Sequence, residues 1–391
     1  MKKPMFFRTV GSRLALGLAG CLILLAGCAE PPPHPDYPQL DSPIRDATVE
    51  LDVIETVPLD APDLGYGALF RFEESEDEIY FVSRRQGTVT VFAEDGTFLR
   101  AFGRQGEGPG EFQHLSSIAL LEDHSVLALD TKLNKIAHFD ADGQLLSDRR
   151  LDLLLPDGRH LILVRRSDLI LDEDGESFYV LTDLFENDMN REMYTDSLIV
   201  SRFNLHGERS ASFGRFDPLF LEKISIFQLS NRTLTRSRTG NQLAFVQGAT
   251  PFVYVHDLDT DEHFKFGRLG DHFRQAEHGI DTDDMRDQRQ FIRTYSQTGR
   301  VFAFESGWAV VYATPDQVQD YNAFTIARKQ YLQVYDKSFN QIGPDILLDP
   351  DLFMYISLVD HEGTGYGLRY DDDGVKMVKF NLIVDACELF L

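Results

Sequence analysis

The chain has 391 residues and a formal net charge of −25, from 63 acidic and 38 basic residues. A surface this acidic repels phosphate backbones, so the composition argues against nucleic acid as a partner. Of the three cysteines, Cys21 lies inside an N-terminal apolar run and Cys28 ends it, which leaves Cys387 without a partner for a disulfide.

The N-terminus has the pattern of a secretory signal. Residues 1–13 are basic and contain no acidic residue, and the apolar run that follows ends in LAGC at Leu25–Cys28. A basic start, a short apolar run and small residues before the cleavage site are typical of such signals, and the run is short for a membrane span. The ending resembles the lipobox of bacterial lipoproteins, which implies a signal peptide over residues 1–27 and a lipid on Cys28. An uncleaved helical anchor is the alternative.

A proline-rich segment follows. Six of the 19 residues after Cys28 are proline, and this composition favours an extended polyproline conformation that rises about 3.1 Å per residue. We therefore expect residues 28–47 to form a tether that holds a domain up to about 60 Å from a lipid surface. Residues 48–391 are expected to form the folded domain.

The domain contains a repeated pair of strands. Each copy is a run of alternating apolar residues, a turn of the D-x-D-G type and a second alternating run, which predicts a hairpin. One position, occupied by an aromatic residue or histidine, marks the register of every copy: Phe92, Phe139, Phe203, His256, Tyr335 and Phe380. A glycine that can adopt a positive φ follows four residues later in three copies, at Gly96, Gly143 and Gly207.

One or two further strand-like runs precede each hairpin, for example Leu115–Glu122 and Ser125–Asp130 in the second copy. Six units of up to four strands predict an all-β fold, a six-bladed β-propeller of four-stranded antiparallel blades. The alternating segment Ala47–Asp60 is expected to close the ring by pairing with Val375–Val384. The tail Asp385–Leu391 is a rival for the same sheet edge.

The segment FGRQGEGPGEF, Phe102–Phe112, resembles the joint between NHL repeats, and the similarity continues to Leu146. It departs from that family at Leu115, where the repeats usually have proline. Over its full length the chain is similar to TolB-like six-bladed propeller lipoproteins of Gram-negative bacteria. The resemblance implies a lipid-anchored protein of the cell envelope. Ala29 is not the acidic residue associated with inner-membrane retention, which favours the outer membrane.

Three long insertions fall into loop classes that share one face of a propeller: the loops between strands two and three, and the connections between blades. They are Asp183–Ser197, Arg268–Gly299 and Thr314–Lys329, and Thr282–Thr294 has the pattern of a short helix. Loops on a rigid scaffold commonly carry function, so we expect this face to bind the ligand. Insertions that an arbitrary surface tolerates are the alternative.

Candidate ligand-binding residues lie on the same face. Arg104, Arg215 and Arg268 share one repeat position, where guanidinium groups could hold carboxylate or sulfate, or could simply pair with neighbouring acidic residues. The loops between strands two and three add further polar candidates: Arg84, Arg85, Asp130, Lys132 and Asn134. The insertions add aromatic residues suited to stacking on a sugar or peptide: Phe185, Tyr194, Tyr321 and Phe324.

The sequence offers no residue set for metal or covalent chemistry. The D-x-D-G stretches that begin at Asp140 and Asp172 lack the ligand spacing of a calcium loop and are what tight turns prefer. His272, Glu277 and His278 do not follow a zinc-binding pattern. No nucleophile motif and no Gly-Lys-Ser/Thr phosphate loop occurs. We therefore predict no metal, no cofactor and no catalytic residue.

These observations favour a non-catalytic binding module that presents one loop-rich face to a peptide, glycan or partner protein. The alternative is a metal-dependent propeller hydrolase or lyase of the lactonase kind, which needs metal ligands from several blades. The equivalent ends of the second strands are Ser83, Asp130, Thr182, Gln247, Ala313 and Arg369. One acid among these positions is poor for Ca²⁺. A structural subunit of an envelope assembly is the second alternative.

Overall fold

The computed structural model divides the chain into two compact units, Met1–Asp36 and Tyr37–Leu391. All described residues belong to the second unit: 37–60, 72–74, 78–84, 86–185, 191–222, 232–237, 240–277, 285–316, 328–350, 355–359, 363–371 and 374–385. The predicted signal peptide and the predicted lipidation site Cys28 lie outside them.

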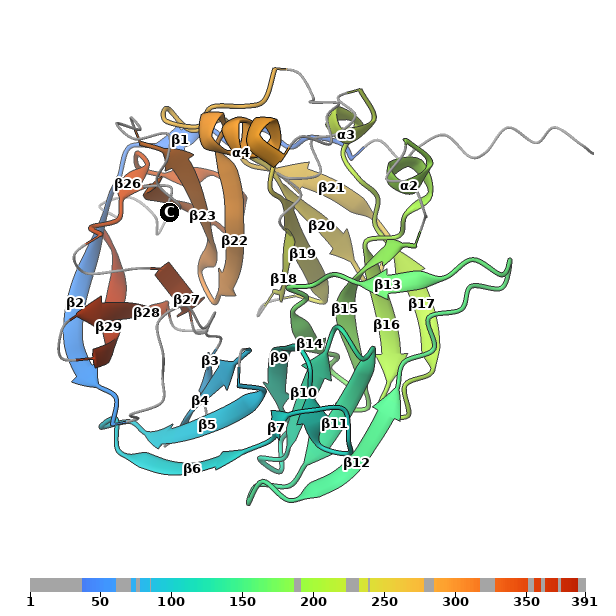
Figure 1. Ribbon diagram of the computed structural model, residues 1–391. Coiled ribbons are helices and arrows are strands. Elements are labelled where there is room, and N and C mark those ends of the chain that lie inside the picture. Colours follow the sequence, from blue (N-terminus) through green and yellow to red (C-terminus); the bar gives the residue numbers. More distant parts are fainter. Residues whose placement is uncertain are drawn as a thin grey trace, which may run out of the picture. The chain divides into compact units, whose positions relative to one another are not determined.

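Six mainly antiparallel sheets, which we call blades 1 to 6, form the main body of the described part of this unit (Figure 1). Blade 1 consists of β3 (Phe72–Glu74), β4 (Glu78–Ser83), β5 (Thr88–Ala93) and β6 (Phe98–Phe102). Blade 2 consists of β9 (Leu115–Leu120), β10 (Val126–Asp130), β11 (Lys135–Phe139) and β12 (Leu145–Arg150). Blade 3 consists of β13 (Leu161–Leu163) and β14 (Leu169–Leu171) as an interrupted first strand, then β15 (Ser177–Leu184), β16 (Val200–Asn204) and β17 (Arg209–Phe213).

The other three blades follow the same order. Blade 4 consists of β18 (Arg232–Arg236), β19 (Gln242–Gln247), β20 (Val253–Asp257) and β21 (His263–Phe266). Blade 5 consists of β22 (Gln297–Phe304), β23 (Gly307–Pro315), β24 (Arg328–Asp336) and two short outer pieces, β25 (Gln341–Ile342) and β26 (Ile346–Leu347). Blade 6 consists of β27 (Tyr355–Val359), β28 (Thr364–Asp371), β29 (Gly374–Asp385) and the N-terminal β2 (Thr48–Pro58).

The first strands of the blades form a closed ring. β3 contacts β9, β9 contacts β14, β14 contacts β18, β18 contacts β22, β22 contacts β27, and β27 contacts β3. Each blade extends outward from this ring through its second, third and fourth strands. The predicted six-bladed propeller of mainly antiparallel blades is therefore confirmed.

The six marker residues of the repeat are all buried in the third strands of their blades. Phe92 shares a hydrophobic cluster with Val57 of blade 6, and Phe139 shares one with Phe102 of blade 1, so these markers pack between neighbouring blades. In blades 1, 2, 3 and 6 the fourth strand has a one-residue bulge beside the marker. Because a bulge increases the local twist, its recurrence gives these outer strands a common geometry.

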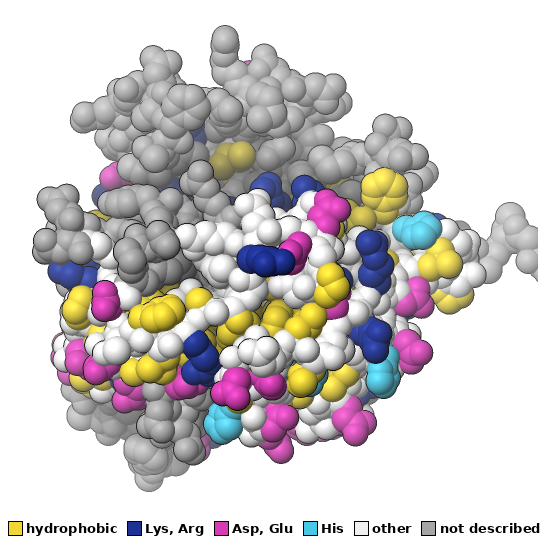
Figure 2. All heavy atoms as spheres, turned by 60° about the horizontal axis from the view of Figure 1, so that its bottom comes forward, with side chains coloured by type: hydrophobic (Ala, Val, Ile, Leu, Met, Phe, Trp, Pro, Cys, Tyr) yellow, Lys and Arg dark blue, Asp and Glu magenta, His cyan; other side chains and the backbone are white. Residues whose placement is uncertain are grey.

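The bulges also expose apolar side chains. Leu99 of β6 and Leu146 of β12 are the extra residues, and their side chains are exposed together with those of Phe98 and Leu145. Figure 2 brings forward the side of the molecule where these strands lie and shows hydrophobic side chains gathered there, with acidic side chains along the edge. The apolar alternation of the fourth strands is therefore only partly a sign of burial.

The ring closes as the sequence predicts. β2 pairs antiparallel with β29 along almost its whole length, from Thr48 opposite Asp385 to Pro58 opposite Lys376. This places the fourth strand of blade 6 at the beginning of the chain and joins it to the third strand near the chain's end. The rival tail lies outside the described residues, beyond Asp385.

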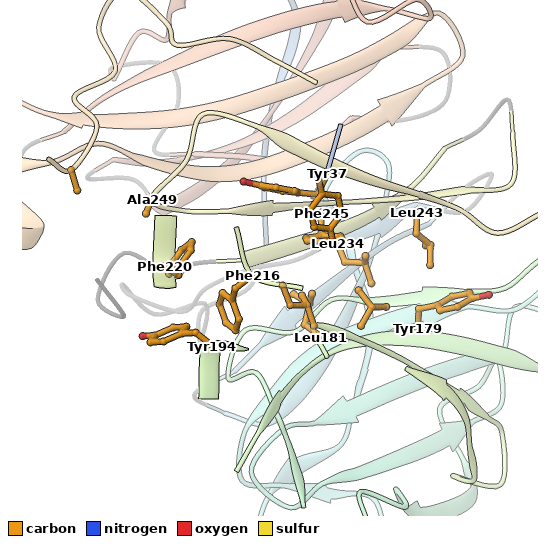
Figure 3. Packing of buried hydrophobic residues seen from close by; sticks show 14 residues of the cluster. Tyr37, Tyr179, Leu181, Tyr194, Phe216, Phe220, Leu234, Leu243, Phe245 and Ala249 are labelled. Carbon is orange, nitrogen blue, oxygen red and sulfur yellow. The ribbon is translucent and has the colours of Figure 1, made fainter. Parts of the chain in front are cut away.

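Residues 37–47 pack on the propeller, although we expected them to belong to the tether. Tyr37 is 6% exposed and lies against Phe245 of blade 4 (Figure 3), and its ring also meets that of Tyr254 edge-on. Its hydroxyl accepts a hydrogen bond from the backbone N–H of Arg215 (2.8 Å). Farther along, β1 (Ile44–Arg45) pairs with β25 of blade 5. The folded unit therefore begins at Tyr37, and the predicted start at Thr48 is too late.

Short helices lie in the connections between strands. They are α2 (Arg191–Asp196), α3 (Pro218–Glu222) and α4 (Met285–Thr294). α4 confirms the predicted helix over its described part, while residues 282–284 with the predicted cap lie outside it. Among the described residues, no helix has the length and apolar character required to cross a membrane.

Candidate functional site

One end of the blades carries the long loops. Because neighbouring strands in a blade are antiparallel, the loops between strands two and three leave at the same end as the connections between blades. We call this end the loop face. α2 follows β15, α3 follows β17 and α4 follows β21, so all three helices belong to these two loop classes. The insertion Thr314–Lys329 is of the same class, but its residues 317–327 lie outside the described part.

Four arginines and one histidine lie in or beside the first and second strands of four blades and interact electrostatically. We call Arg84, His114, Arg165, Arg166 and Arg300 the arginine cluster. Arg84 follows β4 in blade 1, Arg165 and Arg166 lie between β13 and β14 in blade 3, and Arg300 lies in β22 of blade 5. His114 directly precedes β9 of blade 2. Electrostatic interactions connect His114 with Arg84, Arg165 and Arg166, and connect Arg166 with Arg300.

Irregular backbone interrupts the first strands where the cluster lies. Arg165 and Arg166 occupy a turn in which the N–H of Ser167 donates to the carbonyl of Val164 (2.8 Å). Arg300 directly follows a register shift in β22, and a second shift lies in β9 near Ser117. Bulges are frequent next to functional sites because they redirect side chains out of the regular alternation.

Hydrogen bonds fix the histidine of the cluster against Arg165. The Nδ1 atom of His114 lies 2.7 Å from the hydroxyl of Thr131, and its Nε2 atom accepts a hydrogen bond from Nε of Arg165 (3.4 Å). The same hydroxyl of Thr131 donates to the carbonyl of Arg165 (3.3 Å). These partners assign the proton to Nδ1 of a neutral imidazole. Ser116 adds a bond from its hydroxyl to the carbonyl of Ser167 (2.8 Å).

The electrostatics of the cluster are those of crowded positive charges. Burial, followed by the repulsion of Arg84 and Arg165, lowers the pKa of His114 to about 4, although Asp130 opposes this. Arg166 is accessible to solvent, yet desolvation by the surrounding protein lowers the pKa of its guanidinium, and Arg165 and Arg300 lower it further. At neutral pH His114 is therefore uncharged while the arginines beside it are charged.

Asp130, predicted as a ligand-binding residue, is fully buried and serves the fold. Its carboxylate accepts hydrogen bonds from the backbone N–H groups of Gln113 (2.6 Å), Lys132 (2.8 Å) and Leu133 (2.9 Å). Gln247, at the same repeat position in blade 4, similarly binds backbone groups of the connection that enters its blade. In blades 2 and 4 the ends of the second strands therefore anchor these connections, and the carboxylate of Asp130 is occupied by backbone donors.

The neighbouring candidates differ in exposure. Lys132 is exposed at the loop face. Asn134 has a φ of 52° and ends the loop between β10 and β11, as Gly87 with a φ of 65° ends the corresponding loop of blade 1. Asparagine tolerates this left-handed conformation better than most residues, so the presence of Asn134 is explained by backbone geometry.

The three arginines of the shared repeat position lie just after fourth strands, and one of them, Arg104, makes the pair with an acidic residue that the structural alternative expects. Nε of Arg104 donates to the carboxylate of Glu111 (2.7 Å), within the joint where β7 (Arg104–Gln105) pairs with β8 (Glu111–Phe112). Nη1 of Arg215 donates to the carbonyl of Asp196 (2.8 Å) at the C-terminus of α2, where a positive charge is favourable. Arg268 is half-buried beyond β21.

The predicted aromatic ligand contacts differ in exposure. Phe185 is 53% exposed just beyond β15. Tyr194 is buried and packs edge-on against Phe216 at 4.9 Å, so it cannot stack on a ligand. Three further candidates, Arg85, Tyr321 and Phe324, lie outside the described residues.

Two acidic turns and one histidine of the insertion, His272, have structural partners, while His278 lies outside the described residues. Asp140 accepts hydrogen bonds from the backbone of Asp142 and Gln144 within its turn, and Asp172 accepts from the hydroxyl of Tyr179. His272 stacks on Tyr331 at 4.5 Å. Among the described residues, no group of three or more metal-ligating side chains is placed to hold an ion.

Sequence reasoning missed most of the arginine cluster. The predicted candidates lie in hairpin loops, insertions and the connections between blades, whereas Arg165, Arg166 and Arg300 belong to first strands or to a break in one. Adjacent arginines are a weak signal for the site, because the pair Arg165-Arg166 is one of three in the chain, beside Arg84-Arg85 and Arg149-Arg150.

Comparisons with solved structures agree on the fold. The chain is similar to a member of the DUF4221 family from Bacteroides vulgatus, with a TM-score of 0.69 and 11% identity over 86% of this chain and 98% of that one. It is similar to a "Putative exported protein" from Bacteroides fragilis, with a TM-score of 0.53 and 15% identity over 86% and 95% of the two chains. At these identities the likeness concerns the fold alone.

A search of curated proteins finds no match. A family model does match: DUF5128, described as "6-bladed beta-propeller", covers residues 50–245, half of the chain, from β2 into β19. The matched segment contains blades 1 to 3 and the strand that closes the ring. The chain therefore belongs to the DUF5128 family of six-bladed β-propellers.

Proposed function

We propose that the chain is an exported, lipid-anchored binding protein that holds a ligand at its loop face and performs no catalysis. The observation that carries the proposal is the arginine cluster, which gathers positive charge at the loop face of a chain whose net charge is −25. Such a local field concentrates ligands of opposite charge and orients them. A peptide, a glycan or a partner protein is the expected ligand class.

Several features support export to the envelope. The signal pattern and the lipobox-like ending at Cys28 support a lipid anchor, and the resemblance to NHL repeats and TolB-like lipoproteins points the same way. The Bacteroides fragilis relative carries the description quoted above. Cys28→Ser is expected to abolish incorporation of a labelled fatty acid and to release the protein from the outer-membrane fraction. Unchanged labelling or fractionation contradicts the anchor.

The enzyme alternative is distinguished by metal content. A propeller hydrolase or lyase of the lactonase kind needs a divalent metal held by side chains of several blades. We expect elemental analysis of the purified mature chain to find no stoichiometric metal. One Ca²⁺ or Zn²⁺ per chain would favour the enzyme.

Site-specific cross-linking in intact envelopes tests the binding face. A photoreactive phenylalanine derivative at position 132, which is exposed at the loop face, is expected to capture a partner. The matched control is position 142, an exposed aspartate in the turn at the opposite end of blade 2. Equal capture at both positions, or capture at 142 alone, contradicts the assignment of the loop face. A partner captured in one-to-one amount that persists through high salt would favour a structural subunit of an envelope assembly.

A further inference from the structure

We propose that the arginine cluster binds an oxyanion group of the ligand, a carboxylate, sulfate or phosphate, between arginines from alternate blades. The inference rests on the proposed function and narrows it to an acidic ligand. Arg84 comes from blade 1, Arg165 and Arg166 from blade 3, and Arg300 from blade 5. Arg165, Arg166 and Arg300 belong to first strands or to a break in one, and Arg84 follows a second strand, so the proposed anion site draws on three blades.

The positive charges of the cluster act on one another. Arg166 lies close enough to Arg165 and Arg300 for both to repel its charge, and His114 is kept neutral by burial and by Arg84 and Arg165. Like charges held together in a partly desolvated place repel more strongly than in water. An oxyanion among the guanidinium groups would offset this repulsion, whereas a neutral ligand would not.

The side chain of Arg165 contacts an uncharged partner, the imidazole of His114. The described residues place no carboxylate within ion-pair distance of Arg165, and its Nε donates to the neutral imidazole of His114. Arg104, in contrast, is paired with Glu111. Arg165 can therefore direct its remaining N–H donors to a ligand, and guanidinium groups match the geometry of carboxylate, sulfate and phosphate with paired hydrogen bonds.

The supporting bonds prepare this arrangement in advance. Ser116 and Thr131 of blade 2 bind backbone carbonyls of the Arg165–Ser167 turn, and His114 holds the side chain of Arg165. Two blades therefore fix the segment that carries two of the arginines. Binding groups that are already positioned lose less conformational entropy when the ligand arrives.

Calorimetric titration of the full mature chain, carrying Cys28→Ser, tests the proposal. The probes are inorganic phosphate, sulfate, citrate and an oligogalacturonate, with a neutral oligosaccharide of equal length as the uncharged comparison. We expect the anions to bind and the neutral oligosaccharide not to bind. Arg165→Gln with Arg166→Gln is expected to weaken anion binding by about tenfold to a hundredfold, since each hydrogen bond to a charged group contributes about 1.5–3 kcal/mol.

A matched control separates a site from general charge. Arg149→Gln with Arg150→Gln removes the same charge from the adjacent arginine pair at the end of the outer strand β12, where both residues are exposed. This variant is expected to bind anions as the unmodified chain does. Equal weakening in both double variants, or no binding of any anion, overturns the proposal.

The titrations with different anions distinguish a free acid from an acidic group on a glycan. Together with the cross-linking experiment they also separate the oxyanion site from the binding of a macromolecule. Tight binding of the small anions supports a free acid as ligand, while much tighter binding of oligogalacturonate supports an acidic group on a glycan. If cross-linking at position 132 captures a partner but anions neither bind nor compete, the proposed function stands and the oxyanion site fails. If anions bind but no partner is captured, the site stands and the macromolecular ligand fails.

Discussion

Gly143, in the last turn of blade 2, lies directly against the ring of Phe102 in the outermost strand of blade 1. A Cβ atom at position 143 would lie 2.7 Å from the ring, and Gly143 has a φ of 82°. Gly96 approaches the carbonyl of Pro58 in the same way, and Gly207 that of Arg150. The repeated glycine therefore serves both the turn and the contact with the preceding blade.

Gly143→Ala is expected to destabilise the propeller through both effects. A left-handed φ costs a residue with a Cβ about 1–2 kcal/mol, and overpacking against Phe102 adds about 1–3 kcal/mol. Urea unfolding of the mature chain measures the sum. Gly158→Ala is the matched control, because Gly158 has a φ of 88° but a Cβ atom there would meet nothing within 4 Å. Equal losses for the two variants would show that the contact with Phe102 contributes nothing.

The features that the sequence predicts well are local. Alternation, the D-x-D-G turns and the marker residues lie within a few positions of one another, so Phe92 or Phe139 and the glycine after it define a hairpin without knowledge of the rest. The closing strand β2 was also predictable, because its eleven residues alternate and it precedes the first inner strand of blade 1.

The features that the sequence hid depend on distant partners. β18, with the sequence RTLTR, looks too polar for an inner strand, but Arg232 pairs with Asp183 and Arg236 pairs with Asp172, both in blade 3. Tyr37 lies in a proline-rich stretch and is buried because it packs against Phe245 and Tyr254 of blade 4. The arginine cluster combines residues more than 200 positions apart, from Arg84 to Arg300. No local sequence pattern predicts that such distant residues lie close together in the fold.

His114 is expected to make the stability of the domain depend on pH. Its pKa of about 4 in the folded chain lies below the value near 6.5 of an unfolded histidine. The unfolded state therefore binds more protons between these values, and stability falls as the pH drops from 7 towards 4. The charged groups that set this pKa are Arg84, Arg165, Arg166 and Asp130.

The measurement compares the unmodified chain with His114→Gln. Between pH 7 and pH 5 the unmodified chain should lose about 2 kcal/mol of unfolding free energy through His114. The loss arises over the roughly 1.5 pH units in which the histidine is protonated in the unfolded chain but neutral in the folded one. Urea unfolding at the two pH values gives this number, because carboxylates titrate in both proteins and cancel. An identical pH dependence in the variant would contradict the assigned role of His114. Added sulfate should reduce the effect if the anion binds beside the imidazole and raises its pKa.

Tyr37 is expected to stabilise the fold although it precedes the closing strand. Tyr37→Ala removes a buried ring from its contacts with Phe245 and Tyr254 and should cost about 3–5 kcal/mol. Tyr37→Phe keeps the ring but removes the acceptor of the N–H of Arg215, and should cost about 1 kcal/mol. Chemical unfolding of both variants measures the two losses. A loss below about 1 kcal/mol for the alanine variant would mean that the segment only rests on the surface.

The buried pair of Asp183 and Arg232 connects blade 3 to blade 4. Both side chains are more than 90% buried, Nη1 of Arg232 donates to Oδ1 of Asp183 (2.7 Å), and the guanidinium lies over the ring of Phe216 at 4.9 Å. Removing one partner of such a pair leaves a buried charge without compensation and costs about 3–5 kcal/mol. Asp183→Asn should therefore destabilise strongly.

Replacing both partners should do less harm than replacing one. In the double variant Asp183→Leu with Arg232→Met no charge is buried, so the desolvation cost of both ions disappears along with their attraction. We expect the double variant to be more stable than Asp183→Asn in urea unfolding. Arg159→Gln is the control for an exposed pair: Arg159 contacts Asp157 and Asp196 at the surface, and its loss should cost no more than about 1 kcal/mol. The double variant could instead prove less stable than both Asp183→Asn and Arg159→Gln. In that case the specific geometry of the pair joins the two blades, and an uncompensated buried charge does not explain the cost of Asp183→Asn.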